Sequence, residues 1–201
     1  MNKDQLLKKL SCALSKSNAI KIAQDKTCLP SNLIDLSFDP EKEIAFRASW
    51  VLEQFLYYRL DDLLQSLPEF IAGYHLQKNQ SCQRHFTKIM MFIVDLGSFS
   101  ETSILLARYK DQIIETTFDW LINPETPVAV QANCMDILFL FCKEQSWIKD
   151  ELFFQVQFLL RDGSASVQSR GKRILKKLKT WIPANCLKIY SLNLDARFAN
   201  T

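Results

Sequence analysis

An apolar pattern with offsets of 0, 4, 7 and 11 residues recurs four times along the chain. These offsets place four side chains on one face of an α-helix. Successive copies begin 38, 46 and 39 residues apart, a period typical of stacked helical pairs. The copies are Ile44, Ala48, Val51 and Phe55; Cys82, Phe86, Ile89 and Ile93; Val128, Ala132, Met135 and Phe139; and Val167, Gly171, Ile174 and Leu178. We therefore expect an all-α fold, a right-handed α–α superhelix of helical-pair repeats.

The composition supports a helical reading. The chain has 201 residues, of which 48% are hydrophobic, 4 are Gly and 6 are Pro. Asp162-Gly163 is the single dipeptide of the hairpin type, and it lies between helical patterns rather than strand patterns. The longest apolar run, 137–142, is too short to cross a bilayer. We expect a cytoplasmic protein without a membrane partner.

Breaks in the helical patterns suggest one helical-repeat domain over 1–201. Smaller helices are expected over 1–38, about three and a half repeats over 39–181, and a tail that caps the last repeat or self-associates over 182–201. Asp39 is expected to cap a helix beginning at Pro40, and Pro68 to break the next one. A loop is expected over 97–100. Thr126 and Ser164 are predicted N-caps, with Pro127 opening its helix.

The repeat pattern over 39–181 resembles the HEAT-like and armadillo-like families of α-solenoids. Such repeats often carry an arginine ahead of the small position of the stripe. Arg47 and Arg84 precede the small or aromatic position, whereas Gln131 stands there in the third copy. Ala48, Ala132 and Gly171 share the small position, where we expect close helix approach, and Phe86 predicts a splayed interface in the second copy. The resemblance implies a binding scaffold.

Three short strings resemble a narrower group of bacterial proteins of about this length. They are Ala48-Ser49-Trp50-Val51-Leu52-Glu53, Phe118-Asp119-Trp120-Leu121-Ile122-Asn123 and Gly163-Ser164-Ala165. Some members of that group carry an adenylosuccinate lyase label. Those lyases are longer chains with a Ser-Ser-x-Met-Pro-x-Lys-x-Asn loop, and no such string occurs in this chain.

The side chains that usually perform catalysis are sparse. His75 and His85 have no second histidine or cysteine at metal-ligand spacing. Glycine-rich phosphate loops and the G-x-S-x-G nucleophile motif do not occur. The six cysteines form no C-x-x-C pair, and we interpret those within apolar patterns as reduced core residues. We interpret His85 as a partly buried structural residue, and we predict no catalytic residue, metal site or cofactor.

The strongest candidate for a binding surface is the basic helix near the C-terminus. Residues 161–201 carry nine Lys and Arg against two Asp, on a chain whose net charge is +3. One flank of the helix has basic residues at offsets 0, 3 and 7, and the other at 0, 4 and 7. The flanks are Arg170, Arg173 and Lys177, and Lys172, Lys176 and Lys179. Either they clamp an anionic partner, or they keep a terminal helix solvated and complement its dipole.

Three functions from different classes remain open at this point. The first is a non-enzymatic scaffold that binds a protein or an acidic peptide. The second is nucleic-acid binding through the basic helix, because the chain resembles HEAT-like DNA alkylation-repair proteins in size and helical make-up. An enzyme of the lyase class is a third reading. The sequence leaves the identity of the partner and the oligomeric state open.

Overall fold

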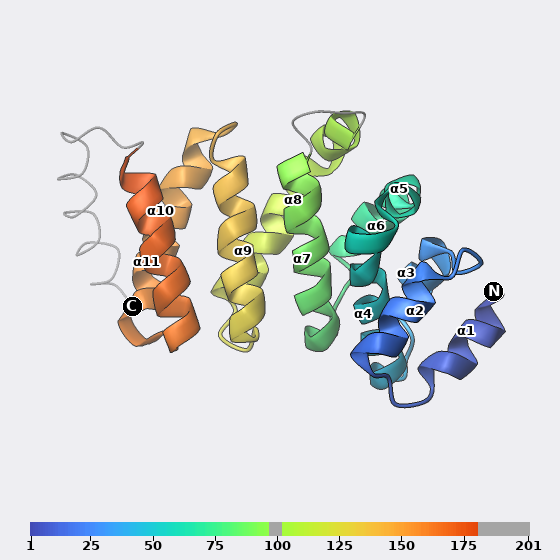
Figure 1. Cartoon of the computed structure of the whole chain (residues 1–201). Helices are drawn as coiled ribbons and strands as arrows, with labels where there is room; N and C mark the ends of the chain where they lie inside the picture. Colours follow the sequence, from blue (N-terminus) through green and yellow to red (C-terminus); the bar gives the residue numbers. More distant parts are fainter. Residues whose placement is uncertain (97–101, 181–201) are drawn as a thin grey trace. The chain divides into compact units, whose positions relative to one another are not determined.

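A computed structural model describes residues 1–96 and 102–180, and all regular secondary structure in these ranges is helical (Figure 1). This confirms the all-α class. The expected loop over 97–100 and the expected tail over 182–201 lie outside the described residues.

The helices run in chain order with short connections. Their bounds are α1 Lys3–Leu10, α2 Lys16–Gln24, α3 Pro30–Leu36, α4 Lys42–Tyr58, α5 Leu60–Gln65, α6 Leu67–Tyr74, α7 Gln80–Leu96, α8 Thr102–Ile122, α9 Val128–Phe141, α10 Ser146–Asp162 and α11 Ala165–Lys179.

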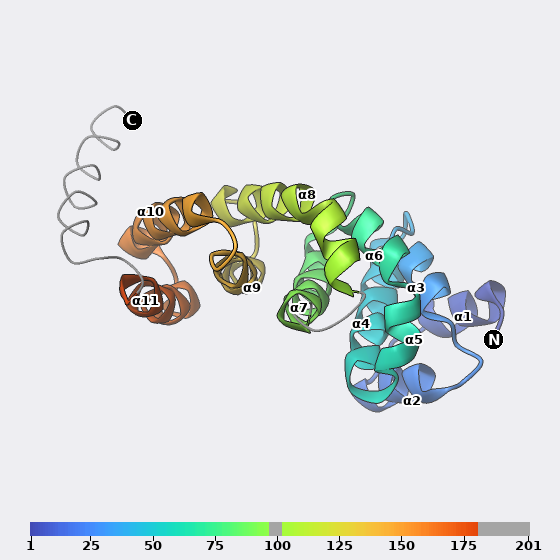
Figure 2. The same cartoon turned by 90° about the horizontal axis from the view of Figure 1, so that it is seen from above.

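The chain divides into two compact units, Met1–Asp119 and Trp120–Thr201. Helix α4 is the centre of the first unit, where it packs against α1, α2, α3, α5 and α7. Its core face is wide, because ten of its residues are buried. In the second unit, α11 packs against both α9 and α10, and α9 also contacts α10 (Figure 2).

Helix ends follow the sequence signals with three corrections. Asp39 Oδ1 accepts the N–H of Glu41 at 2.8 Å, so it closes a turn, and α4 begins only at Lys42. Pro127, and not Thr126, is the N-cap of α9. Ser164 is the N-cap of α11, but its side chain accepts no capping hydrogen bond. The break at Pro68 is confirmed, because α5 ends at Gln65 and Pro68 lies in the first turn of α6.

The apolar stripes are buried as predicted in α4, α7 and α11. The third stripe is partly wrong, because Val128 is 37% exposed and Phe139 is half-buried. The buried stripe of α9 keeps the same offsets but starts two residues later, at Val130, Cys134, Ile137 and Phe141. Nearly every residue of α9 is apolar or small, so its sequence does not specify which face is buried.

The small position marks close approach at Gly171. A Cβ built there would lie 3.0 Å from side-chain atoms of Val156 and Leu160, both on α10. Phe86 in the second copy is fully buried and packs beside Phe38 and Phe70, with ring centroids 5.9 and 4.9 Å away. The ring therefore fills an interior space.

Helices α4, α7, α9 and α11 each secure the end of an earlier helix or turn. Each has a side chain near its start that donates to backbone carbonyls there, which lack partners within their own helix. Arg47 donates to Leu10 O at 2.9 Å. The equivalent donors are Gln83 to Gln77 O, Gln131 to Leu121 O and Asn123 O, and Gln168 to Leu160 O. Arg84 is exposed, so the neighbouring Gln83 takes the role that the family resemblance suggested for an arginine.

Candidate functional site: two cationic surfaces

The two basic flanks of α11 differ in their surroundings. Asp136 on α9 accepts from Arg173 Nη2 at 2.9 Å and forms a close ion pair with Arg170. Burial and the neighbouring Arg173 lower the pKa of Arg170. Lys177 Nζ lies 5.1 Å from the ring centroid of Phe139, within range of a cation–π contact. This flank therefore joins α11 to α9.

The second flank remains exposed to solvent. Lys172, Lys176 and Lys179 are all exposed, and within residues 1–96 and 102–180 none of them has a hydrogen-bond or ion-pair partner. Their offsets of 4 and 3 place them on one side of the helix, over about 10 Å of its length. We call these three residues the α11 lysine row. Of the six predicted binding residues, these three have no ion pair, hydrogen bond or cation–π contact within the described residues, whereas the other three each contact α9.

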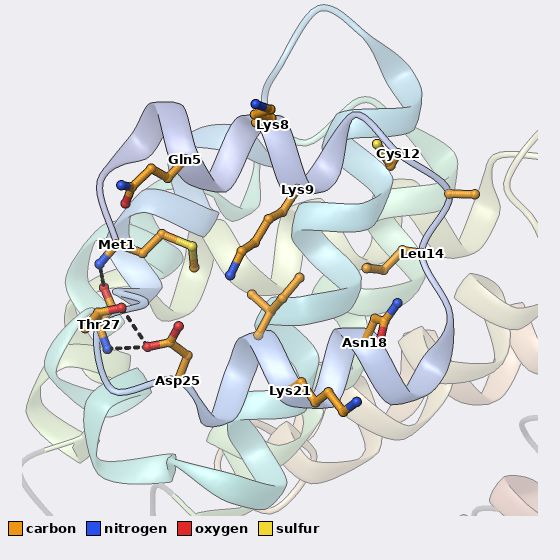
Figure 3. A pocket seen from close by; sticks show the side chains of 12 residues that line it. Met1, Gln5, Lys8, Lys9, Cys12, Leu14, Asn18, Lys21, Asp25 and Thr27 are labelled. Carbon is orange, nitrogen blue, oxygen red and sulfur yellow. Dashed lines mark hydrogen bonds between the residues drawn. The ribbon is translucent and has the colours of Figure 1, made fainter.

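A second cationic surface was missed by the sequence analysis. An open groove of about 990 Å³ lies between α1 and α2, and its lining comes from both helices and the segments that flank them (Figure 3). Lys9 points from α1 into the space between the helices, and Lys21 lies on the α2 side (Figure 3). Half-buried Leu14 and buried Ile22 supply apolar surface. We call this the α1–α2 groove.

The groove carries a net positive charge. Lys8, Lys9 and Lys21 line it, and in the described part of the chain no carboxylate pairs with their ammonium groups. The one acidic residue of the lining, Asp25, accepts from the backbone N–H and Oγ1 of Thr27 at 2.9 and 2.6 Å. These hydrogen bonds lower the pKa of Asp25. The nearby Lys9 ammonium lowers this pKa as well, so the carboxylate stays charged and the lining has three lysines against one acidic side chain.

The sequence indicates the groove only through the basic residues of two short amphipathic helices. The apolar pattern predicts those helices, but it does not predict the space between them. It arises because α1 and α2 each pack on α4. Such a position depends on tertiary contacts separated by tens of residues, which a local pattern does not encode.

The two histidines have different environments. His75 is exposed at the end of α6. His85 is 6% exposed, and its Nδ1 lies 2.5 Å from Glu53 Oε2. Lys88 Nζ donates to the other oxygen of Glu53 at 2.9 Å. His85 is therefore a buried residue that joins α7 to α4, in agreement with its interpretation as a structural histidine.

The described thiols divide into one exposed and four buried groups. Cys12 is exposed and lines the α1–α2 groove. Burial raises the pKa of Cys28 and of Cys82 to about 11 and that of Cys142 to about 12, and it raises the pKa of Cys134 further. The four buried thiols are shielded and harder to ionise, so Cys12 is the most accessible thiol among the described residues.

The described residues form neither a metal cluster nor a membrane span. Among residues 1–96 and 102–180, no three His, Cys, Asp or Glu side chains are placed to share a metal ion. None of the helices in these ranges combines the length and hydropathy needed to span a bilayer.

Comparison with known proteins identifies one family. The model of the HEAT repeat domain matches residues 3–178. No functionally curated protein matches the chain. Among solved structures, an engineered protein from a structural genomics consortium is similar with 14% identity and a TM-score of 0.45, over 90% of this chain and 100% of that one. None of these comparisons points to an adenylosuccinate lyase.

Proposed function

Because the chain belongs to the HEAT repeat family, we propose that it is a non-enzymatic scaffold that binds another protein through an acidic segment. Stacked helical repeats present extended surfaces of regularly spaced side chains, which suit protein ligands. On α11 the observation that supports this function is the α11 lysine row. Its three ammonium groups are exposed and available, while the opposite flank is engaged with Asp136 and Phe139.

The spacing of the row matches an acidic helix or an extended acidic segment. Two successive intervals of about one helical turn separate Lys172, Lys176 and Lys179, so carboxylates at a similar spacing can pair with all three. Exposed ion pairs contribute about 0.2–1 kcal/mol each. The row would therefore determine orientation and partner choice, and it would speed association more than it raises affinity.

Affinity capture from extract of the protein's own cells tests this proposal. The wild-type chain is compared with the charge-reversal variant K172E/K176E/K179E and with the control K16E/K26E/K42E, whose three lysines are exposed on the first unit. We expect a partner that is captured by the wild type and the control but lost with the α11 variant. Equal capture by both variants would show that the row only solubilises the helix.

Nucleic-acid binding is the second candidate, because the same three ammonium groups can contact phosphates. Each phosphate contact on duplex DNA lowers the slope of log K against log salt by about 0.9, so three contacts predict a slope near −3. Fluorescence anisotropy with a short duplex and a short single-stranded RNA measures this slope. Absence of binding at low ionic strength would remove the candidate, and nuclease treatment of the captured material would separate it from protein binding.

A further inference from the structure

The α1–α2 groove combines two chemistries within one open channel. Its lining carries three lysines, and Lys9 and Lys21 come from different helices (Figure 3). Leu14 and Ile22 provide apolar surface between these cationic sides. Helices α1 and α2 have eight and nine residues, so the channel is flanked by helices about 12–14 Å long.

We propose that the α1–α2 groove binds an acidic amphipathic helix of a partner protein, with about two turns of that helix in contact. Carboxylates of the partner pair with Lys9 and Lys21, and an apolar side chain packs against Leu14 and Ile22. This inference deepens the proposed scaffold function and rests on it, because it names the chemistry of a partner. It uses a surface separate from α11.

The distribution of charge favours a peptide over other anions. A single-headed amphiphile, such as a fatty acid, requires cations that converge at one end of a pocket, whereas Lys9 and Lys21 come from different helices (Figure 3). A phosphate polymer has no apolar side chain to cover Leu14. An acidic amphipathic helix has both the spread of carboxylates and the apolar face, which is the usual recognition mode for an amphipathic helix in a groove.

Cys12 supplies a site-specific probe of occupancy. Its thiol is exposed and forms part of the groove lining. A bound helix would shield it, so its alkylation by iodoacetamide would slow. Mass spectrometry of the peptide that contains Cys12 reports on this thiol alone, whatever the reactivity of the others. The probe ligand is a synthetic 16-residue helix with Glu on one face and Leu on the other, compared with a matched peptide in which Gln replaces every Glu.

The protein variants separate charge from apolar contact. We expect K9Q/K21Q to weaken protection of Cys12 by the Glu peptide about tenfold, as two exposed ion pairs imply. The matched control K16Q/K26Q removes two exposed lysines of the same segment that lie outside the groove lining, and it should leave protection unchanged. L14N should also weaken protection by the Glu peptide, because it removes apolar surface while keeping both lysines.

The outcomes distinguish this inference from the broader function. Protection by the Glu peptide that depends on Lys9 and Lys21, together with little protection by the Gln peptide, supports the inference. Equal protection by a short DNA duplex, by oleate or by vesicles containing an anionic lipid would overturn it. An absence of protection at saturating peptide, with capture that still depends on the α11 lysine row, would refute the groove but leave the scaffold standing. Protection of Cys12 by the Glu peptide, without capture that depends on the α11 lysine row, would support the groove and refute the row as a binding surface.

Discussion

Arg173 Nη2 lies 2.9 Å from Asp136 Oδ1, so a basic residue that the sequence offered as a ligand-binding group also joins α11 to α9. Arg170 shares the same carboxylate. Asp136 is only 16% exposed, and a carboxylate in that position accepts two guanidinium groups with less competition from water than a surface pair would have. One acidic residue thus reduces the number of cations that α11 offers to a partner.

The substitution Asp136→Asn should release both arginines from this carboxylate. We expect the free energy of unfolding to fall by about 1–2 kcal/mol, because two charge-assisted hydrogen bonds weaken at a partly exposed site. Binding of any polyanion to α11 should become tighter and more salt-dependent, since two more cations are available. Urea denaturation and anisotropy with a short DNA duplex measure the two effects. Asp111→Asn, at an exposed position of α8, is the control, and unchanged behaviour of both variants would contradict the prediction.

Glu53 is the most deeply buried acidic residue among the described residues, with 5% of its surface exposed. Burial raises the pKa of Glu53, but hydrogen bonds from His85 and Lys88 outweigh it, and the net pKa is lowered. A lowered pKa in the folded state contributes stability that is fully present above the unfolded value, near 4.3. That contribution is lost as the pH falls through the folded value.

Replacing Glu53 by Gln should therefore have a pH-dependent effect. At neutral pH we expect a loss of about 2–3 kcal/mol, because His85 and Lys88 keep their places without the anion. As the pH falls from the unfolded value towards the lowered folded value, the difference from the wild type should shrink, because the wild-type carboxyl then becomes protonated. Thermal denaturation of both proteins from neutral to acidic pH measures the loss of stability and its decrease as the pH falls. Glu43→Gln removes an exposed carboxylate paired with Arg47 and should cost much less; equal losses would show that burial of the cluster is irrelevant.

Arg47 secures the C-terminal end of α1 through Leu10 O. Arg47→Met keeps most of the aliphatic stem but removes the donors, so we expect a loss of about 1–2 kcal/mol and faster hydrogen exchange in α1. Because α1 forms one side of the α1–α2 groove, peptide protection of Cys12 should weaken as well. Arg84→Met alters an exposed arginine of α7, next to the capping Gln83, and should leave both measurements unchanged. Normal exchange in α1 of the Arg47 variant would exclude the capping role.

Local pattern was sufficient for much of the fold. The stripes of α4, α7 and α11 are buried as their spacing predicted, because each has polar residues on its opposite side. Helix α9 lacks that contrast, and its register was misjudged by two residues for Val128 and Phe139. The starts of α4 and α9 were misplaced by one or two residues because Asp39 and Thr126 lie in turns that a capping signal resembles.

The candidate surfaces were harder to predict. Helical spacing correctly divided the basic residues of α11 into two flanks, but only a tertiary contact with Asp136 shows which flank is engaged. Asp136 lies 34 residues before Arg170, and no local rule joins them. The α1–α2 groove could not be predicted from local patterns either. It is a space between two helices, and it depends on how each of them packs against α4.

Gly171 provides a test of the close approach between α11 and α10. Leucine at this position must occupy space already filled by Val156 and Leu160, whose side chains would lie 3.0 Å from an added Cβ. We expect Gly171→Leu to lower the free energy of unfolding by about 1–3 kcal/mol, even though leucine favours a helix more than glycine does. Ser169→Leu adds a similar volume at an exposed position of the same helix and should be close to neutral. If urea denaturation shows the two variants to be equally stable, the two helices are not in the tight contact that the small residue implies.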